Sequence, residues 1–157
     1  MSEKLGLFLA SCFFLVVSFL GVVFLYPCLN GTLFHNILLG VFTGTITLCP
    51  LSAISYIYER KTVKQQFIHE VLTLISSESR ILESKNVFNP VGYSLRVKNL
   101  SKTIVILNKV SKKGAKVAQE IQNIFLKGVP TLKSSTDLMN SFRSIVTNVN
   151  SYLDELN

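Results

Sequence analysis

The stretch "LGLFLASCFFLVVSFLGVVFLY", residues 5–26, decides the fold because it contains no charged side chain. As an α-helix it would be about 33 Å long, enough to cross a hydrocarbon core of about 30 Å. A cleaved signal peptide is the alternative, but its apolar region would span only about 7–15 residues and end at a small-residue cleavage site. The following "LYPCLNG" is a poor site of that kind. The stretch therefore predicts a transmembrane helix.

A second apolar run, "FHNILLGVFTGTITLCPLSAISYIY", follows at 34–58 and is also long enough to span. Only "PCLNGTL", residues 27–33, separates the two runs. Pro27 fixes its φ angle, and Asn30 and Gly31 tolerate a positive φ, so all three favour a turn. The sequence predicts an antiparallel transmembrane hairpin over residues 1–58, with spans at 5–26 and 34–58.

The charges that flank the two runs predict the orientation of the hairpin. Lys4 precedes the first run, Arg60, Lys61 and Lys64 follow the second, and the turn between them has no charge. Basic residues are retained on the cytoplasmic side of a membrane. We therefore expect a multi-pass protein of the cell inner membrane with both termini in the cytoplasm.

The second run contains small and polar residues that share one face of a helix. At 100° per residue, this face lies around Gly40 and Gly44. Small residues let another backbone approach closely, and threonine hydroxyls can bond across helices or to their own backbone. We expect this face to be a transmembrane packing or pore face, formed by Asn36, Gly40, Thr43, Gly44, Thr47 and Pro50.

Two arrangements fit such a face. It can pack within one copy, against the side of the first span that carries Gly6, Ala10, Ser11, Ser18 and Gly21, or several copies can bring it together around a narrow, weakly polar path. In both, Pro50 bends the helix because it cannot donate a backbone hydrogen bond. The opposite side is expected to face lipid, through Leu38, Phe42, Ile46, Cys49 and Ala53.

Residues 59–157 form a separate basic domain. All charged residues except Glu3 and Lys4 lie there, 15 Lys and Arg against 8 Asp and Glu, so this domain carries the formal net charge of +7. Apolar spacing predicts a cytoplasmic bundle of about three helices: one over 59–85 that can continue the second span, one over 95–127 hinged near Gly114, and one within 134–157. A connection is expected at 86–94, and "GVPTLK" is expected to stop the second of these helices.

Two parts of this domain each allow two structural interpretations. The alternation in "YSLRVK" and the β-branched "TIVIL" leave strands possible at 95–107. The last helix carries a heptad pattern typical of a short coiled coil, which can pack within one copy or join copies. We take it as the assembly seam of a homo-oligomer, formed by Leu138, Phe142, Ile145, Val149, Tyr152 and Leu156.

Basic residues dominate the middle of the domain. From Lys85 to Lys116 there are eight Lys or Arg and no acidic residue. A solvated surface, an anionic lipid surface and nucleic acid are the three interpretations; few aromatic side chains are present for base stacking. The predicted basic surface for lipid or nucleic acid consists of Arg96, Lys98, Lys102, Lys109, Lys112, Lys113 and Lys116.

No pattern in the chain indicates an enzyme. The sequence has no Gly-rich phosphate loop and no catalytic Ser, Cys or His motif, so we expect a non-enzyme without cofactors. The three cysteines are dispersed and only two histidines are present, which predicts neither a disulfide framework nor a metal site.

The organisation, a charge-free two-span hairpin followed by cytoplasmic helices, resembles the small two-transmembrane effectors of bacterial anti-phage systems, such as SLATT-type proteins and the effectors of some retrons. The resemblance implies an oligomer that permeabilises or depolarises the inner membrane when triggered. It also implies a regulatory protein or nucleoprotein partner. A membrane-anchored scaffold or accessory subunit that binds a cytoplasmic protein is the alternative, and a phage holin a weaker third.

Overall fold

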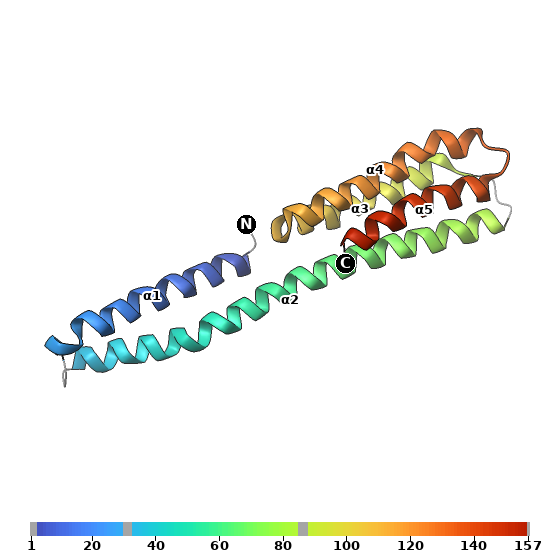
Figure 1. Ribbon diagram of the computed structural model, residues 1–157. Coiled ribbons are helices and arrows are strands. Elements are labelled where there is room, and N and C mark those ends of the chain that lie inside the picture. The colour runs from blue at the N-terminus through green and yellow to red at the C-terminus, as the bar shows by residue number, and fades with distance from the viewer. Residues whose placement is uncertain (1–2, 30–32, 85–87, 157) are drawn as a thin grey trace. The chain divides into compact units, whose positions relative to one another are not determined.

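The computed structural model describes residues 3–29, 33–84 and 88–156, and in these ranges the chain is entirely helical and contains no strand (Figure 1). The strand alternative at 95–107 is therefore wrong. The described ranges hold five α-helices: α1 (Glu3–Leu29), α2 (Leu33–Glu83), α3 (Pro90–Val110), α4 (Lys112–Ser134) and α5 (Leu138–Leu156). The predicted turn at Asn30 and Gly31 lies outside the described residues.

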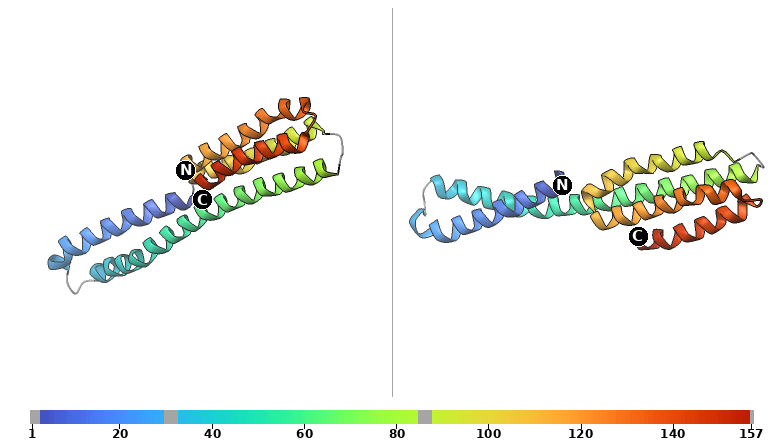
Figure 2. Two further views of the ribbon diagram at one scale, coloured as in Figure 1. Left: turned by 45° about the vertical axis from the view of Figure 1, so that its right-hand side comes forward. Right: turned by 90° about the horizontal axis from the view of Figure 1, so that it is seen from above.

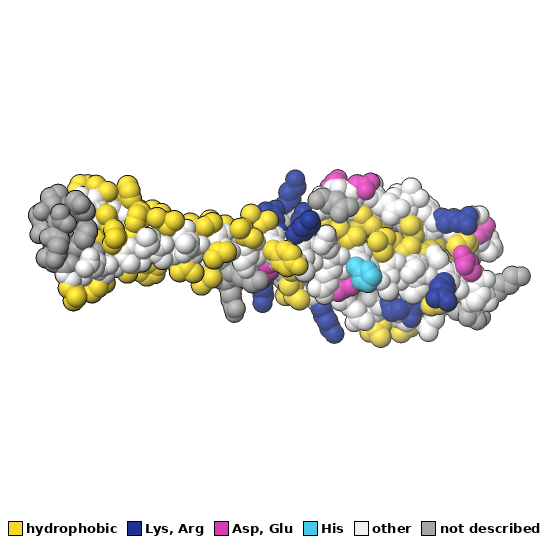
Figure 3. Space-filling model, turned by 90° about the horizontal axis from the view of Figure 1, so that it is seen from below, with side chains coloured by type: hydrophobic (Ala, Val, Ile, Leu, Met, Phe, Trp, Pro, Cys, Tyr) yellow, Lys and Arg dark blue, Asp and Glu magenta, His cyan; other side chains and the backbone are white. Residues whose placement is uncertain are grey.

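The chain divides into two compact units, Met1–Glu59 and Arg60–Asn157. Among the described residues two helices, α1 and α2, are long and apolar enough to cross a membrane. Figure 3 shows yellow hydrophobic side chains over the surface of the first unit and dark blue Lys and Arg side chains on the second. The first unit contains α1 and residues 33–59 of α2, and the second contains residues 60–83 of α2 with α3, α4 and α5.

Helix α2 is continuous from Leu33 to Glu83, as its apolar spacing beyond the second span allows. Pro50 lies inside the helix without ending it. A proline at this position removes one backbone hydrogen bond but leaves the turns on either side intact. The predicted bend at Pro50 stays a prediction.

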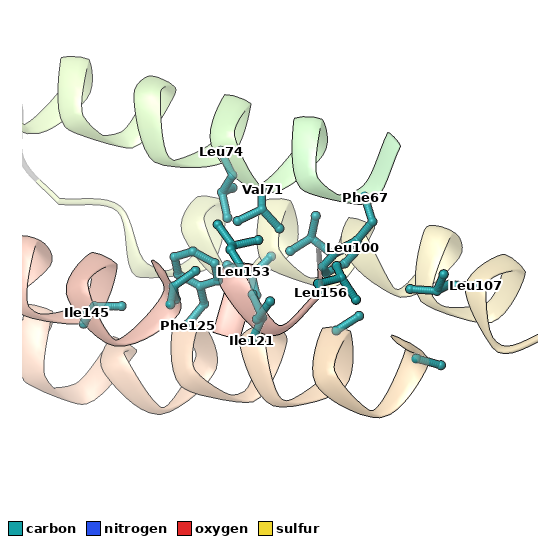
Figure 4. Close-up of a cluster of buried hydrophobic side chains, with 14 of the residues drawn as sticks. Phe67, Val71, Leu74, Leu100, Leu107, Ile121, Phe125, Ile145, Leu153 and Leu156 are labelled. Carbon is teal, nitrogen blue, oxygen red and sulfur yellow. The ribbon is translucent and has the colours of Figure 1, made fainter. Parts of the chain in front are cut away.

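In the unit Arg60–Asn157, four helical segments enclose one hydrophobic core. Phe67 and Val71 of α2, Leu100 of α3, Phe125 of α4 and Leu156 of α5 contribute to it, and Figure 4 shows such side chains pointing toward one another. Each segment presents its apolar stripe at a spacing of three and four residues, so each buries one face.

The helix expected over 95–127 is two helices, which makes four segments where about three were predicted. The break is at Ser111 and not at Gly114. Ser111 ends α3 with an extended backbone, and its Oγ accepts a hydrogen bond from Gly114 N at 3.1 Å, which caps the first turn of α4. Serine is a favoured N-cap because it satisfies one of the free amides there.

The predicted connection at 86–94 is too long. Helix α3 already begins at Pro90, and the Asn89 side chain accepts a hydrogen bond from Gly92 N at 3.0 Å. Asparagine before proline is a helix start because proline suits the first helical position, where no backbone donor is needed. Residues 86 and 87 lie outside the described residues.

The predicted stop at "GVPTLK" is also wrong, since α4 continues to Ser134 with Pro130 inside it. At Gly128, α4 packs closely against Ile145 of α5. A Cβ at this position would overlap Ile145 Cδ1 of α5, so a larger residue here would require the Ile145 side chain to move.

The heptad seam of α5 packs within a single copy. Phe142, Ile145, Val149 and Leu156 are buried in the core of the unit, and Leu138 and Tyr152 are half-buried against it. Leu153, which the seam did not include, is buried as well. The interpretation in which the seam joins copies needs these side chains to leave this core, and it stays a prediction.

Candidate functional site

Helices α1 and α2 contact each other through small polar side chains in the unit Met1–Glu59. Oxygen atoms lie 2.9 Å apart in the Ser11–Ser52 pair and 3.3 Å apart in the Ser18–Thr45 pair. Between them, the Sγ atoms of the free cysteines Cys12 and Cys49 are 3.2 Å apart. Partner numbers rise on one helix as they fall on the other, so the two helices run antiparallel along this line.

The sequence carried a signal for this contact that the helical projection around Gly40 missed. Ser11 and Ser18 are seven residues apart on α1, and Thr45 and Ser52 are seven apart on α2. A seven-residue spacing returns to the same face of a helix, so two such pairs predict a line of hydrogen bonds between neighbouring helices.

The face around Gly40 and Gly44 is uncovered in a single copy. A Cβ at either glycine would meet no heavy atom within 4 Å, and Asn36, Thr43, Thr47 and Pro50 are all exposed. The threonine hydroxyls donate within their own helix, Thr43 to Leu39 O at 2.7 Å and Thr47 to Gly44 O at 2.8 Å. The predicted packing or pore face is therefore open to another molecule.

Leu38, Phe42 and Cys49, from the side of α2 expected to face lipid, contact α1 instead, whereas Ile46 from the same side is exposed. Leu38 packs on Gly21, where a Cβ would lie 3.2 Å from Leu38 Cδ2, and the Phe42 and Phe19 rings are 5.9 Å apart between centroids. Ser11, Ser18 and Gly21 of the first span do make the contact, as one arrangement expected, but with the opposite face of α2. Large apolar side chains pack on this side because α1 offers small residues to receive them.

The predicted basic residues occupy α3 and the first turns of α4 in the other unit. Six are exposed: Lys98, Lys102, Lys109, Lys112, Lys113 and Lys116. Arg96 differs from them, because its Nε donates to Glu78 Oε1 in a salt bridge. The Glu78 side chain is 2% exposed and the Arg96 side chain 40%. Arg96 therefore balances a buried charge as well as contributing to the basic surface.

Two carboxylates of α2, Glu78 and Glu70, interact with side chains of α3. Thr103 Oγ1 donates to Glu70 Oε2 at 2.6 Å, about two helical turns before the Glu78–Arg96 pair along α2. The missed signal is the spacing of four, three and four from Phe67 through Val71 and Leu74 to Glu78, which puts an acid on the core stripe, where it needs a partner.

A groove of about 690 Å³ lies beside these contacts, between α2 and α3. Polar side chains line most of it, including His69, Asn99 and Lys102. Tyr93, which is near Glu78, is fully buried and donates its hydroxyl to Phe125 O at 3.4 Å. Burial, and to a smaller extent the charge of Glu78, raises the pKa of Tyr93 well above its usual value.

In the described part of the chain, no group of three or more His, Cys, Asp or Glu side chains is placed to hold a metal ion. No family model, no curated protein and no solved structure matches the chain. The resemblance to two-transmembrane effectors thus stays an expectation drawn from the order of apolar and basic segments.

Proposed function

We propose that the protein is an oligomeric effector of the inner membrane that permeabilises or depolarises the membrane when triggered, in defence against phage. In this proposal, α1 and the first part of α2 form a transmembrane hairpin. The helices of Arg60–Asn157 form a cytoplasmic bundle, and both termini are cytoplasmic. A regulatory protein or nucleoprotein partner would hold the effector silent.

The observation that carries the proposal is the uncovered face of α2. Helix α1 already covers the opposite side, so the small residues at 40, 43, 44 and 47 are not needed to assemble the hairpin. Small residues in a span favour close contact between helices. A second copy is therefore the partner that this face fits best. The threonine hydroxyls keep lone pairs for a passing cation or an incoming donor after donating to their own helix.

The outer surface of the same unit supports its place in a bilayer. Its large apolar side chains point outward, among them Phe13 at 65% exposed and Phe24 at 73%. An apolar surface of this extent is unfavourable in water and favourable in hydrocarbon.

The proposal is tested by induced expression in bacteria with a membrane-potential dye. We expect loss of potential and growth arrest, relieved by Gly44→Leu and by Thr47→Leu because added bulk separates the copies. Ile46→Phe is the matched control: it adds bulk at an exposed position on another side of the helix and should leave depolarisation intact. Normal potential at good membrane expression would contradict the proposal.

Cross-linking tests the contact between copies separately from any pore. In a background with the native cysteines replaced by serine, Gly44→Cys should give a disulfide-linked dimer on mild oxidation, because the same face meets itself. Ile46→Cys should stay monomeric. Equal cross-linking at both positions would show that the face is not specific.

A membrane-anchored scaffold is the second candidate, and one feature of α3 favours it. Val91, Leu95, Val105 and Ile106 are exposed on one side of this helix, interleaved with Lys98, Lys102 and Lys109. An exposed apolar row of this kind suits a helix of a protein partner. Normal membrane potential together with loss of a co-purifying protein in Leu95→Asp would favour this function.

A further inference from the structure

Seven basic residues gather at one end of the unit Arg60–Asn157, although they come from two separate parts of the chain. Leu156, at the end of α5, joins them: its carbonyl oxygen accepts from Lys64 Nζ at 2.7 Å, and its Cδ1 would lie 3.5 Å from a Cβ at Gly114. The start of this unit's part of α2, the α3–α4 junction and the end of α5 therefore meet (Figure 2). We call this the basic end: Arg60, Lys61, Lys64, Lys109, Lys112, Lys113 and Lys116.

The charges at the basic end are available for an outside partner. All except Lys64 are exposed, and Lys64 is half-buried because it caps α5. Four acidic residues lie close along the same segments: Glu59 before Arg60, Glu120 one turn after Lys116, and Asp154 and Glu155 in the last turn of α5. Seven basic residues against these four leave an excess of positive charge. The first turn of α4 holds two lysines and no acid, an arrangement that its own helix dipole disfavours. An anionic surface in contact would remove this penalty.

Three residues of the basic end follow the apolar segment directly along α2. Arg60 follows Glu59, the last residue of the apolar unit, and Tyr58 ends the second apolar run. At about 1.5 Å per residue, Lys64 lies about 9 Å along the helix from Tyr58, which is close to one Debye length at physiological salt. Charges at that distance are attracted to anionic headgroups, by about 1 kcal/mol for each Lys or Arg.

We propose that the basic end is a docking surface for anionic phospholipid headgroups, so that the unit Arg60–Asn157 rests on the leaflet from which α2 emerges. This rests on the proposed membrane insertion of α1 and α2 and names the lipid class that the inserted protein recognises. Nucleic acid fits less well, because no Phe, Tyr or Trp lies between Tyr93 and Phe125 to stack on bases.

The test is amine labelling of the full chain in lipid nanodiscs, made of phosphatidylcholine alone or mixed with phosphatidylglycerol. Mass spectrometry reads the labelling rate of each lysine. We expect Lys109, Lys112, Lys113 and Lys116 to react about fivefold more slowly in the anionic discs, the factor that about 1 kcal/mol per residue gives. Lys127 and Lys133 are matched controls on the same helix, with Lys127 about 22 Å from Lys112, and should react equally in both. High salt should abolish the difference.

The outcomes separate the proposals. Equal labelling of the four lysines in both discs overturns the lipid surface. Protection by an added oligonucleotide in phosphatidylcholine discs, without protection by phosphatidylglycerol, overturns it in favour of nucleic acid. A chain that does not co-elute with either disc overturns membrane insertion itself.

A triple variant gives an independent readout. Lys112→Gln, Lys113→Gln and Lys116→Gln together should reduce the lipid dependence that remains at Lys109, because only four of the seven basic residues are left. Folding should persist because all three side chains are exposed. Lys127→Gln with Lys133→Gln is the control and should keep the full effect. An unchanged lipid dependence in the triple variant contradicts the proposal.

Discussion

The two units bury opposite kinds of side chain. In Met1–Glu59 the buried residues described are Ser18, Thr45 and Ser52, and the large apolar side chains point outward. In Arg60–Asn157 large apolar side chains such as Phe67 and Phe125 are buried and lysines are exposed. Apolar burial drives packing only in water, whereas helices in hydrocarbon associate through small and hydrogen-bonding residues. The comparison indicates that each unit is suited to a different solvent.

The largest expected effect is the difference in stability loss when a phenylalanine is shortened to alanine in each of the two units. Phe125→Ala should lower the free energy of unfolding of Arg60–Asn157 by about 3–5 kcal/mol, because it leaves a cavity in a close-packed core. Phe24→Ala, at a position 73% exposed, should change the stability of its unit by no more than about 0.5 kcal/mol. Hydrogen exchange of the full chain in nanodiscs under increasing urea measures both. Similar losses would remove the distinction between the units.

The buried ion pair in the second unit predicts a smaller loss. Arg96→Ala leaves the Glu78 carboxylate buried without its partner and should cost about 2 kcal/mol, less than for a fully buried pair because Arg96 is partly exposed. Replacing both residues by Met should recover most of this loss, since no charge then stays buried. Lys98→Ala, an exposed neighbour on α3, is the control. A double variant as unstable as Arg96→Ala would mean that the two side chains stabilise the unit by their packing and not by their charges.

The smallest effect is a pH dependence confined to alkaline conditions. The folded pKa of Tyr93 is raised above the unfolded value of about 10. Below about pH 10 both states keep the proton, and above it the unfolded state loses the proton first, so stability falls as pH rises. Over that range the stability of the native chain should fall by up to about 1.4 kcal/mol per pH unit more than that of Tyr93→Phe. Parallel curves for the two proteins would show that Tyr93 ionises freely in the folded state.

Much of the helical layout could be predicted from the sequence, because long apolar runs and regular spacing are local signals. The continuous α2 and the heptad face of α5 are examples. The breaks were harder, since proline and glycine act differently in context: Pro90 starts a helix, Pro130 lies inside one, and Gly128 is set by contact with Ile145.

The side of α2 that meets α1 could not be read from α2 alone. Its small residues indicated a contact, but the contact depends on which positions of α1 offer room and hydroxyls, as Gly21 and Ser18 do. The partner of Glu78 was hidden for the same reason, because Arg96 lies on another helix. Long-range pairing is the information that local spacing lacks.

Spin-label accessibility tests most directly the claim that the two units face different solvents. Phe14 and Val105 are almost equally exposed, at 57% and 60%, and each can be replaced by a spin-labelled cysteine in the full chain in nanodiscs with the native cysteines changed to serine. We predict that the label at 14 collides mainly with oxygen, which concentrates in hydrocarbon, and the label at 105 mainly with a water-soluble nickel chelate. A label at 14 that collides mainly with the nickel chelate would contradict the account.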